Sequence, residues 1–420
     1  MRYTQIRTSE AGVIKLSYLF EFLICVFYTW YFLPVFQTLF WTNTYKILFF
    51  SCFLIGTIGL FFLNGYQKNR ILIPIVAYML IFVFLYVLKV GDAQAHIRVS
   101  FMFWGTALLY FGILNDENRV RIGKYLLLLF LLTVVTSALG VIADNNAART
   151  IAHAAAEDEL QAEYKLKNIS NIYLFQCLIL FIPMLICVPQ KARNKVGGWI
   201  LIALIVVTLL NASFTISLII GFFALLLSLA LKETRSKRLV VMIIMSIIVF
   251  LILLNGATVL TYLANRIDNA KISVRLCDLR DLIYFGESSG DIGLRMELYR
   301  SSIQTFFKQP FGCGVHYSYR TFENGIGYHS QILDDLARYG IVAAIFYVML
   351  FRNYYTHLKT SWKHIGYPQI AITSVVIYSL LLVLNLGFRS ADESIVLFFI
   401  LPVMPLLIED FLKKKHQSRF

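Results

Sequence analysis

The sequence predicts an all-α integral membrane protein with about twelve transmembrane helices. Of its 420 residues, 59% are hydrophobic and only 15% are charged, a balance far more apolar than that of a soluble domain. Apolar runs of nearly the length needed to cross a hydrocarbon core, about twenty helical residues, recur along the whole chain. Basic residues gather in alternate connections between these runs, as they do in multi-pass proteins.

The apolar runs divide the chain into one polytopic domain that covers residues 1–420. We expect spans at roughly 16–36, 45–64, 71–88, 96–114, 124–142, 168–188, 198–213, 214–231, 239–260, 339–356, 369–388 and 393–411. The joint at Asn211–Thr215 is either a tight hairpin or a break within one helix.

The distribution of positive charge predicts the orientation. More than half of the 38 Lys and Arg lie in every second connection and near the two ends. The positive-inside rule places these segments, and therefore both termini, in the cytoplasm. The formal net charge of +14 is then a topology signal, and no nucleic-acid partner is needed to explain it.

The same rule makes residues 261–338, between spans nine and ten, one large extracytoplasmic loop. This loop holds most of the polar sequence that could carry chemistry, and its seven arginines outnumber its two lysines. Arginine offers a planar fork of donors suited to phosphate and diphosphate groups. The alternative is that these arginines pair with the loop's nine carboxylates on a solvated surface.

Within the loop, Asp291–Phe307 reads as an amphipathic helix with Arg295 and Tyr299 on one face. Its apolar stripe would face either the membrane or the core. The helix should stop before Pro310, and Gly312 and Gly314 then allow a tight turn. The plain alternative is an interfacial helix followed by a turn. A second outer segment, 143–168, contains an Ala-rich stretch that we expect to be helical, with Arg149 near its start.

His329 precedes the tenth span and would lie at a membrane–water boundary. A histidine there is suited to general-base catalysis, because its ordinary pKa is near ambient pH. The alternative is an interfacial histidine with a satisfied hydrogen bond. The cysteines show no metal-ligand spacing, and we expect neither a metal nor a cofactor. The carboxylate pair Asp334-Asp335 starts a helix, where complementing the helix dipole explains it.

This ordered set resembles the O-antigen polymerase and ligase superfamily, membrane glycosyltransferases with a GT-C type of fold. That family shows an arginine, an aromatic residue four positions on, Pro-Leu-x-Gly-x-Gly, His-Asn and a Gly-Ile-like junction. This chain has, in the same order, Arg295, Tyr299, Pro310-Phe311-Gly312-Cys313-Gly314, His329-Ser330 and Tyr339-Gly340-Ile341.

Two departures from the family pattern stand out. Ser330 replaces the usual asparagine, and Asn211-Ala212-Ser213-Phe214 stands where family members often carry Ser-Arg. Another arginine could take over the phosphate-binding role of the missing one, and the candidates are Arg149, Arg266, Arg275 and Arg389.

The resemblance implies an O-antigen or surface polysaccharide polymerase in the bacterial inner membrane, with its active site on the periplasmic face. Such an enzyme transfers an undecaprenyl-diphosphate-linked glycan onto another lipid-linked repeat unit and releases undecaprenyl diphosphate. His329 and Arg295 are the expected catalytic residues. The expected substrate-binding residues are Arg266, Arg275, Arg300, Arg320, Tyr299, Tyr328, Arg149 and Arg389. The expected partners are the lipid-linked donor and acceptor and membrane lipid, with a chain-length regulator as a candidate.

Two alternatives remain. An O-antigen ligase, which transfers the glycan onto lipid A–core, shares the same pattern. A lipid-linked oligosaccharide flippase would also have about twelve spans, but the long outer loop and the few charged residues within the spans argue against it. Glu21 is the clearest of these, and its place near the cytoplasmic end of its span predicts snorkelling to water rather than a proton relay.

Overall fold

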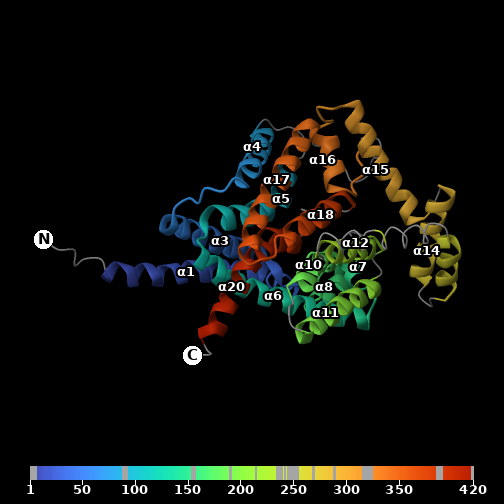
Figure 1. The fold of residues 1–420 in the computed structure, drawn as a ribbon. Coiled ribbons are helices and arrows are strands. Elements are labelled where there is room, and N and C mark those ends of the chain that lie inside the picture. Colours follow the sequence, from blue (N-terminus) through green and yellow to red (C-terminus); the bar gives the residue numbers. More distant parts are fainter. Residues whose placement is uncertain are drawn as a thin grey trace. The chain divides into compact units, whose positions relative to one another are not determined.

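The structure is a computed structural model that describes residues 7–87, 93–152, 158–188, 192–212, 215–232, 240, 243, 255–266, 270–286, 290–314, 325–384 and 391–417. Every regular element in these ranges is helical, as Figure 1 shows. The contacts divide the chain into two compact units, each of which is described by itself.

The first unit comprises residues 1–79, 99–174 and 388–420. Helices α4 (Leu72–Val87), α5 (Ala93–Leu108) and α9 (Ile172–Ile179) are divided between the units. The other elements of the first unit are α1 (Arg7–Phe32), α2 (Pro34–Leu39), α3 (Asn43–Asn64), η1 (Leu109–Ile113), α6 (Asp116–Ala143), α7 (Ala147–Ala152), α8 (Asp158–Leu166), α19 (Ala391–Ile395), η3 (Val396–Ile400) and α20 (Leu401–Gln417).

Helices α1 and α3 pack closely against each other. A Cβ at Gly59 would lie 2.4 Å from the ring of Phe20, so only glycine allows this approach. The two π-helical segments, η1 and η3, are buried in the same unit. They meet through aromatic rings, with the Tyr110 and Phe399 ring centres 5.1 Å apart.

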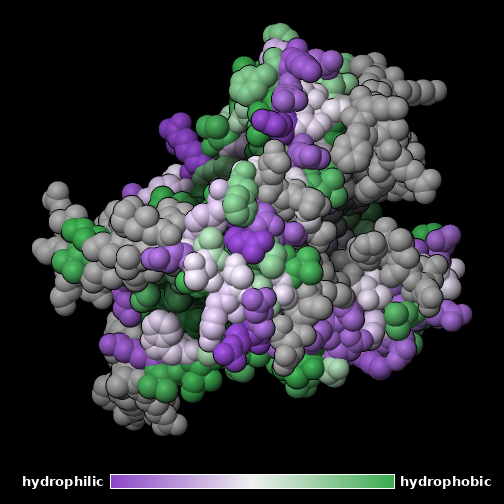
Figure 2. Space-filling view, turned by 90° about the vertical axis from the view of Figure 1, so that its right-hand side faces the viewer, coloured by the Kyte–Doolittle hydropathy of each residue, from purple (hydrophilic) through white to green (hydrophobic). Residues whose placement is uncertain are grey.

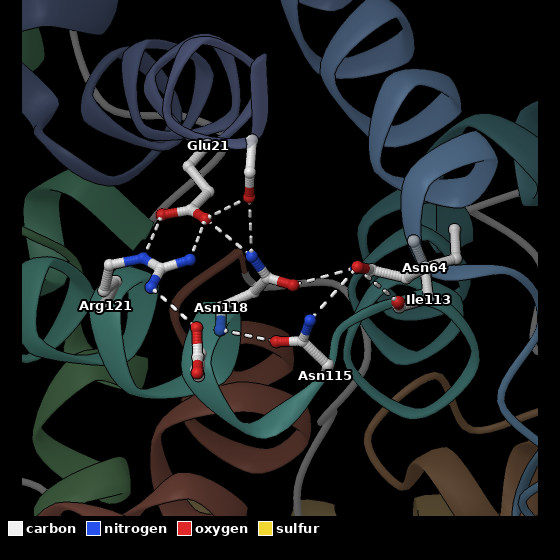
Figure 3. Close-up of polar contacts among 8 residues, drawn as sticks. Glu21, Asn64, Ile113, Asn115, Asn118 and Arg121 are labelled. Carbon is white, nitrogen blue, oxygen red and sulfur yellow. Dashed lines mark hydrogen bonds and ion pairs between the residues drawn. The ribbon is translucent and has the colours of Figure 1, made fainter. Parts of the chain in front are cut away.

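A buried polar cluster joins α1, α3 and α6 (Figure 3). The carboxylate of Glu21, a residue only 5% exposed, accepts hydrogen bonds from Asn118 Nδ2 at 2.6 Å and from Arg121 Nε at 2.8 Å and Nη2 at 2.6 Å. Asn64 Nδ2 donates to Asn118 Oδ1 at 2.8 Å, which brings α3 into the cluster. The expected snorkelling of Glu21 to water is therefore wrong, because a partner on α6 supplies the donors that water would have supplied.

The second unit comprises residues 80–98 and 175–387. Its α11 and α12 pack against each other, and a Cβ at Gly221 would lie 3.7 Å from the Leu209 side chain. This packing favours the hairpin alternative for the expected joint at Asn211–Thr215, of which residues 213–214 lie outside the described part of the chain. The expected span at 168–188 is interrupted at Leu180–Phe181, because Pro183 opens a new helix and has no N–H to continue the old one. The helices of this unit are α10 (Ile182–Cys187), α11 (Ala192–Asn211), α12 (Thr215–Lys232), α14 (Ala270–Phe285), α15 (Asp291–Lys308), α16 (Gln331–Tyr339), α17 (Ile341–His364) and α18 (Gln369–Leu384).

Three of the described helices are long and apolar enough to cross a membrane, at Asn43–Asn64, Asp116–Ala143 and Glu393–Lys413. Shorter apolar helices coincide with further expected spans, at Leu16–Phe32, Leu72–Ile81, Phe101–Ile113, Tyr173–Cys187, Lys195–Asn211, Ile216–Lys232 and Gln369–Leu384. The expected span 239–260 lies mostly outside the described residues. Helix α17 falls in neither group, because polar residues follow Phe351. The total of twelve spans stays a prediction.

Large hydrophobic side chains lie at the surface of both units. On the face shown in Figure 2, hydrophobic residues lie among hydrophilic ones. On α3 alone, Ile47 is 69% exposed and Phe62 is 79% exposed. Such exposure is unfavourable in water but is ordinary for helices that face lipid, so it agrees with the membrane-protein composition.

Candidate functional site

Helix α15 carries the residues that the sequence singled out. The predicted helix Asp291–Phe307 is confirmed by α15, which ends at Lys308, two residues before Pro310. Four of its polar side chains recur at helical spacing and so share one face: Arg295, Tyr299, Ser302 and Thr305. The apolar residues Ile303 and Phe307 are 40% and 75% exposed, so they do not lie in the core and stay available for lipid.

The polar face of α15 holds the short segment 325–330 that leads to His329. Thr305 Oγ1 donates to the Gly325 carbonyl at 2.7 Å, and Gly327 N donates to Ser302 Oγ at 2.8 Å. A Cβ at Gly327 would lie 2.2 Å from the Leu298 carbonyl oxygen. Glycine is therefore required there for the segment to lie against the helix backbone.

The hydrogen bond made by His329 fixes its tautomer. Nδ1 lies 3.2 Å from the Gly327 carbonyl oxygen, and a carbonyl can only accept, so Nδ1 carries the proton of the neutral ring. Nε2 is then left with a lone pair. Burial lowers the pKa of His329 below the ordinary histidine value, and the positive charge of Arg295 lowers it further, while the Gly327 carbonyl opposes both. The neutral form is thus favoured near pH 7.

Arg295 supplies a positive charge beside this imidazole. Its side chain is half-buried, and Nη1 is buried with no hydrogen-bond partner among the described residues. Burial raises the pKa of the neighbouring Tyr299, and the charge and hydrogen bond of Arg295 oppose that rise. Tyr299 Oη donates to the Leu384 carbonyl at 2.7 Å, which ties α15 to the end of α18. A buried guanidinium N–H without a partner is costly unless an anion completes it.

The segment Pro310–Gly314 forms the predicted tight turn, with Gly312 N donating to the Gln309 carbonyl. Gly312 and Gly314 both have φ +96°, a left-handed conformation that glycine adopts without strain. The turn is pinned to the α16–α17 junction, because Ile341 N donates to the Pro310 carbonyl at 2.8 Å. The Gly-x-Gly motif thus serves to hold the junction between α16 and α17.

Helix α16 begins at Gln331, two residues after His329, with an N-cap and two buried carboxylates. Ser330 Oγ accepts from Leu333 N at 3.1 Å and so caps the helix. Asp334 is 1% exposed and accepts from Ser302 Oγ at 2.7 Å and from Ser330 N at 3.2 Å. Asp335 is fully buried and accepts from Tyr347 Oη at 2.6 Å. The helix-dipole explanation for this pair is therefore insufficient, because each carboxylate has its own network.

Arg338, one of the seven loop arginines, is buried and belongs to these networks. Its Nη1 lies 3.4 Å from Asp335 Oδ1, and its guanidinium carbon lies 5.1 Å from the ring centre of Tyr328. Tyr328 has φ +59°, a conformation that non-glycine residues seldom adopt. Arg338 is thus part of the scaffold beside His329 and is not presented on an open surface.

The structure brings Arg295, Tyr299 and His329 together, with Tyr328 adjacent in the chain. Of the other predicted substrate-binding residues, the structure describes the side chains of Arg300 and Arg266, and neither is part of this group. Arg300 is exposed on α15, and Arg266 is exposed with its guanidinium carbon 5.5 Å from the ring centre of Tyr262. Arg149 lies on α7 of the first unit and Arg275 on α14, and the side chains of both, like Arg320 and Arg389, lie outside the described part of the chain.

The sequence did not indicate Ser302 as part of the site, and for Asp334 it indicated only a helix-dipole role and not the hydrogen bond with Ser302. A signal for Ser302 was present, because it follows Arg295 by seven residues and so shares its helix face. Asp334 had no such signal, since its contact with Ser302 spans 32 residues of sequence.

Comparison with known proteins supports the resemblance. Residues 197–348 match the profile of the O-antigen ligase family, and this range contains α15, segment 325–330 and α16. No curated protein sequence matches this chain. The match indicates a function of the O-antigen ligase or polymerase type, with lipid-linked sugar substrates in a membrane. The segment that carries the whole candidate site is therefore similar to the O-antigen polymerase and ligase superfamily.

Proposed function

We propose that this protein is a membrane glycosyltransferase that polymerises undecaprenyl-diphosphate-linked repeat units. The acceptor sugar hydroxyl attacks the anomeric carbon of the donor glycan, a new glycosidic bond forms, and the bond between that carbon and the diphosphate oxygen breaks. The hydroxyl proton passes to the protein and undecaprenyl diphosphate leaves. The observation that carries this proposal is that Arg295, whose Nη1 is buried with no hydrogen-bond partner among the described residues, lies close enough to His329 for its charge to add to the effect of burial in lowering the pKa of the imidazole.

His329 is the proposed general base. Its Nδ1 is committed to the Gly327 carbonyl, so Nε2 is the atom that accepts the proton of the acceptor hydroxyl. A base must be deprotonated before the reaction, and burial together with Arg295 favours that state. General-base catalysis of this kind contributes about 10²–10⁴-fold in rate.

Arg295 is the proposed diphosphate ligand. Negative charge develops on the leaving diphosphate as its bond to the sugar lengthens, and a fixed guanidinium stabilises that charge. Arg295 can take this role because its Nη1 is buried without a partner among the described residues and can therefore donate a hydrogen bond to the diphosphate. Burial is the main cause of the lowered pKa of His329 and the charge of Arg295 adds to it, so a single arginine serves both the base and the leaving group.

The proposal includes an orientation. With both termini in the cytoplasm of a bacterium, residues 261–338 lie on the outer face of the inner membrane, where lipid-linked repeat units are presented. The exposed residues Ile303 and Phe307 of α15 then offer an apolar edge to the polyprenyl chain of the donor.

Transfer onto lipid A–core, the ligase reaction, is the second candidate. The match of residues 197–348 to the O-antigen ligase family favours it, and the two reactions share the donor and the proposed base. They differ in the acceptor, so the choice of acceptor decides between them.

The experiment is an in vitro reaction of purified protein with its lipid-linked repeat unit, analysed on a gel. A ladder of longer glycans, lost in both His329→Ala and Arg295→Ala but kept in the matched control Arg300→Ala, is the expected result. Product that forms only after lipid A–core is added would make the enzyme a ligase. Full activity of the His329→Ala and Arg295→Ala variants at normal protein levels would refute the assignment of the site.

A further inference from the structure

We propose that Ser302 and Asp334 are positioning residues that set the tautomer and orientation of His329. This inference rests on the proposed function, because it assigns His329 the role of base. Neither residue touches the substrate in this scheme. Both act through the backbone of Gly327.

Asp334 orders the hydroxyl of Ser302. Asp334 is 1% exposed, and its two carboxylate oxygens accept from Ser302 Oγ and from the backbone N of Ser330. Since the Ser302 hydroxyl donates its only hydrogen to Asp334, its lone pairs are left to accept. The carboxylate therefore makes the Ser302 hydroxyl a hydrogen-bond acceptor toward Gly327.

Ser302 in turn orients the backbone of Gly327, which holds the imidazole. Ser302 is fully buried, and its Oγ accepts from Gly327 N at 2.8 Å. The N–H and C=O of one residue are linked by its two backbone dihedrals, so fixing Gly327 N helps to direct the Gly327 carbonyl. That carbonyl accepts from Nδ1 of His329. The path from Asp334 to the ring thus consists of three hydrogen bonds.

The backbone of segment 325–330 needs such support. Gly327 lies directly against the backbone of Leu298, and Tyr328 adopts φ +59°, which costs free energy for a side chain of its size. The backbone dihedral angles of a glycine and of a residue with positive φ are not favoured by those residues themselves, so other contacts must hold them. The bonds from α15 therefore define where His329 points.

The other bond along the same face has a different effect. Thr305 holds the carbonyl of Gly325, two residues before Gly327, and so fixes where the segment begins. Loss of the Thr305 hydroxyl leaves the hydrogen bond between Ser302 and Gly327 in place. The inference therefore separates Ser302 from its neighbour Thr305, although both lie on one face of α15.

The decisive measurement is the tautomer of His329, read from ¹⁵N chemical shifts of the full-length protein labelled in histidine and assigned with His329→Ala. In the parent protein we expect the Nδ1-protonated form. Ser302→Ala and Asp334→Asn should give a mixture of tautomers. Ser302→Thr, which keeps the hydroxyl, should restore the parent signal. Ser301→Ala, which removes a hydroxyl from the neighbouring position of α15, is the matched control.

The same variants are then assayed for glycan transfer. We expect kcat of Ser302→Ala and Asp334→Asn to fall by roughly 10–100-fold, the scale associated with a misplaced catalytic group, with KM unchanged. An unchanged tautomer in both variants would overturn the inference, whether or not activity falls, because any loss would then come from folding. Full activity of His329→Ala would instead refute the proposed function, while the tautomer measurement would still report on the positioning.

Discussion

The polar cluster of Glu21 allows a prediction of how strongly one buried charge pair joins two helices. The perturbation is Glu21→Gln, which keeps the shape of the side chain and removes its charge. Glu21 accepts three hydrogen bonds from α6, one from Asn118 and two from Arg121. The amide oxygen of Gln can still accept at the position of Oε1, so at least the bond to Oε2 is lost. Interhelical hydrogen bonds in membranes average about 0.6 kcal/mol, which gives a lower bound of about 0.6 kcal/mol.

An upper bound follows from the burial of the charges. Removing one partner of a buried ion pair costs about 3–5 kcal/mol, because the other charge is left uncompensated. The side chain of Arg121 is 32% exposed and also lies 3.4 Å from Glu117, so solvent and a second carboxylate offset part of that cost. We therefore expect Glu21→Gln to destabilise the protein by about 2–3 kcal/mol.

The assay is unfolding of the purified protein in detergent for Glu21→Gln, Arg121→Gln and the double variant. A double-mutant cycle should give a coupling free energy of about 1–3 kcal/mol between the two residues. The control is the more exposed pair Lys124–Asp410, whose side chains are 47% and 32% exposed, where the same cycle should give less than about 1 kcal/mol. Additive effects at Glu21 and Arg121 would refute the reasoning.

Two further predictions concern the candidate site and its supporting turn. Because His329 acts as a neutral base, activity should fall as pH drops below its lowered pKa. Arg295→Gln removes one cause of the lowering, so the pKa of His329, followed by histidine ¹⁵N chemical shifts, should rise in this variant even though its transfer activity is lost. An unmoved pKa would contradict the assigned charge effect. At the turn, Gly312→Ala or Gly340→Ala should reduce the yield of folded protein, because each added Cβ would lie about 2 Å from a backbone oxygen. The control is Gly65→Ala, which has a positive φ but open space around the added Cβ and should lower the free energy of unfolding by only about 1–2 kcal/mol. Equal yields of all three glycine variants, measured by size-exclusion chromatography, would contradict the role of the close approach.

The local features of α15 could be predicted from the sequence because short-range rules decide them. Pro310 ends the helix and glycines at 312 and 314 allow the turn, whatever surrounds them. The apolar runs likewise predicted where most helices lie, since each run has to be buried or to face lipid. These signals lie within a few residues of the structure they determine.

Contacts between distant residues could not be predicted in this way. Glu21 and Arg121 are 100 residues apart, and nothing in either neighbourhood indicates the other. Asp334 and Asp335 looked alike at the start of a helix, yet one supports Ser302 and the other bonds Tyr347. Only the packing of α16 against α15 and α17 distinguishes the two carboxylates.

The span of the contacts along the chain has a consequence for the order of folding. Within α15, segment 325–330 and α16, the hydrogen bonds join residues only 20 to 32 positions apart, whereas the bond from Tyr299 to Leu384 joins residues 85 positions apart. Closing the longer loop costs roughly 1 kcal/mol more in chain entropy. The surroundings of His329 are therefore expected to assemble first as a local unit, and docking onto α18 follows once the later helices have been made.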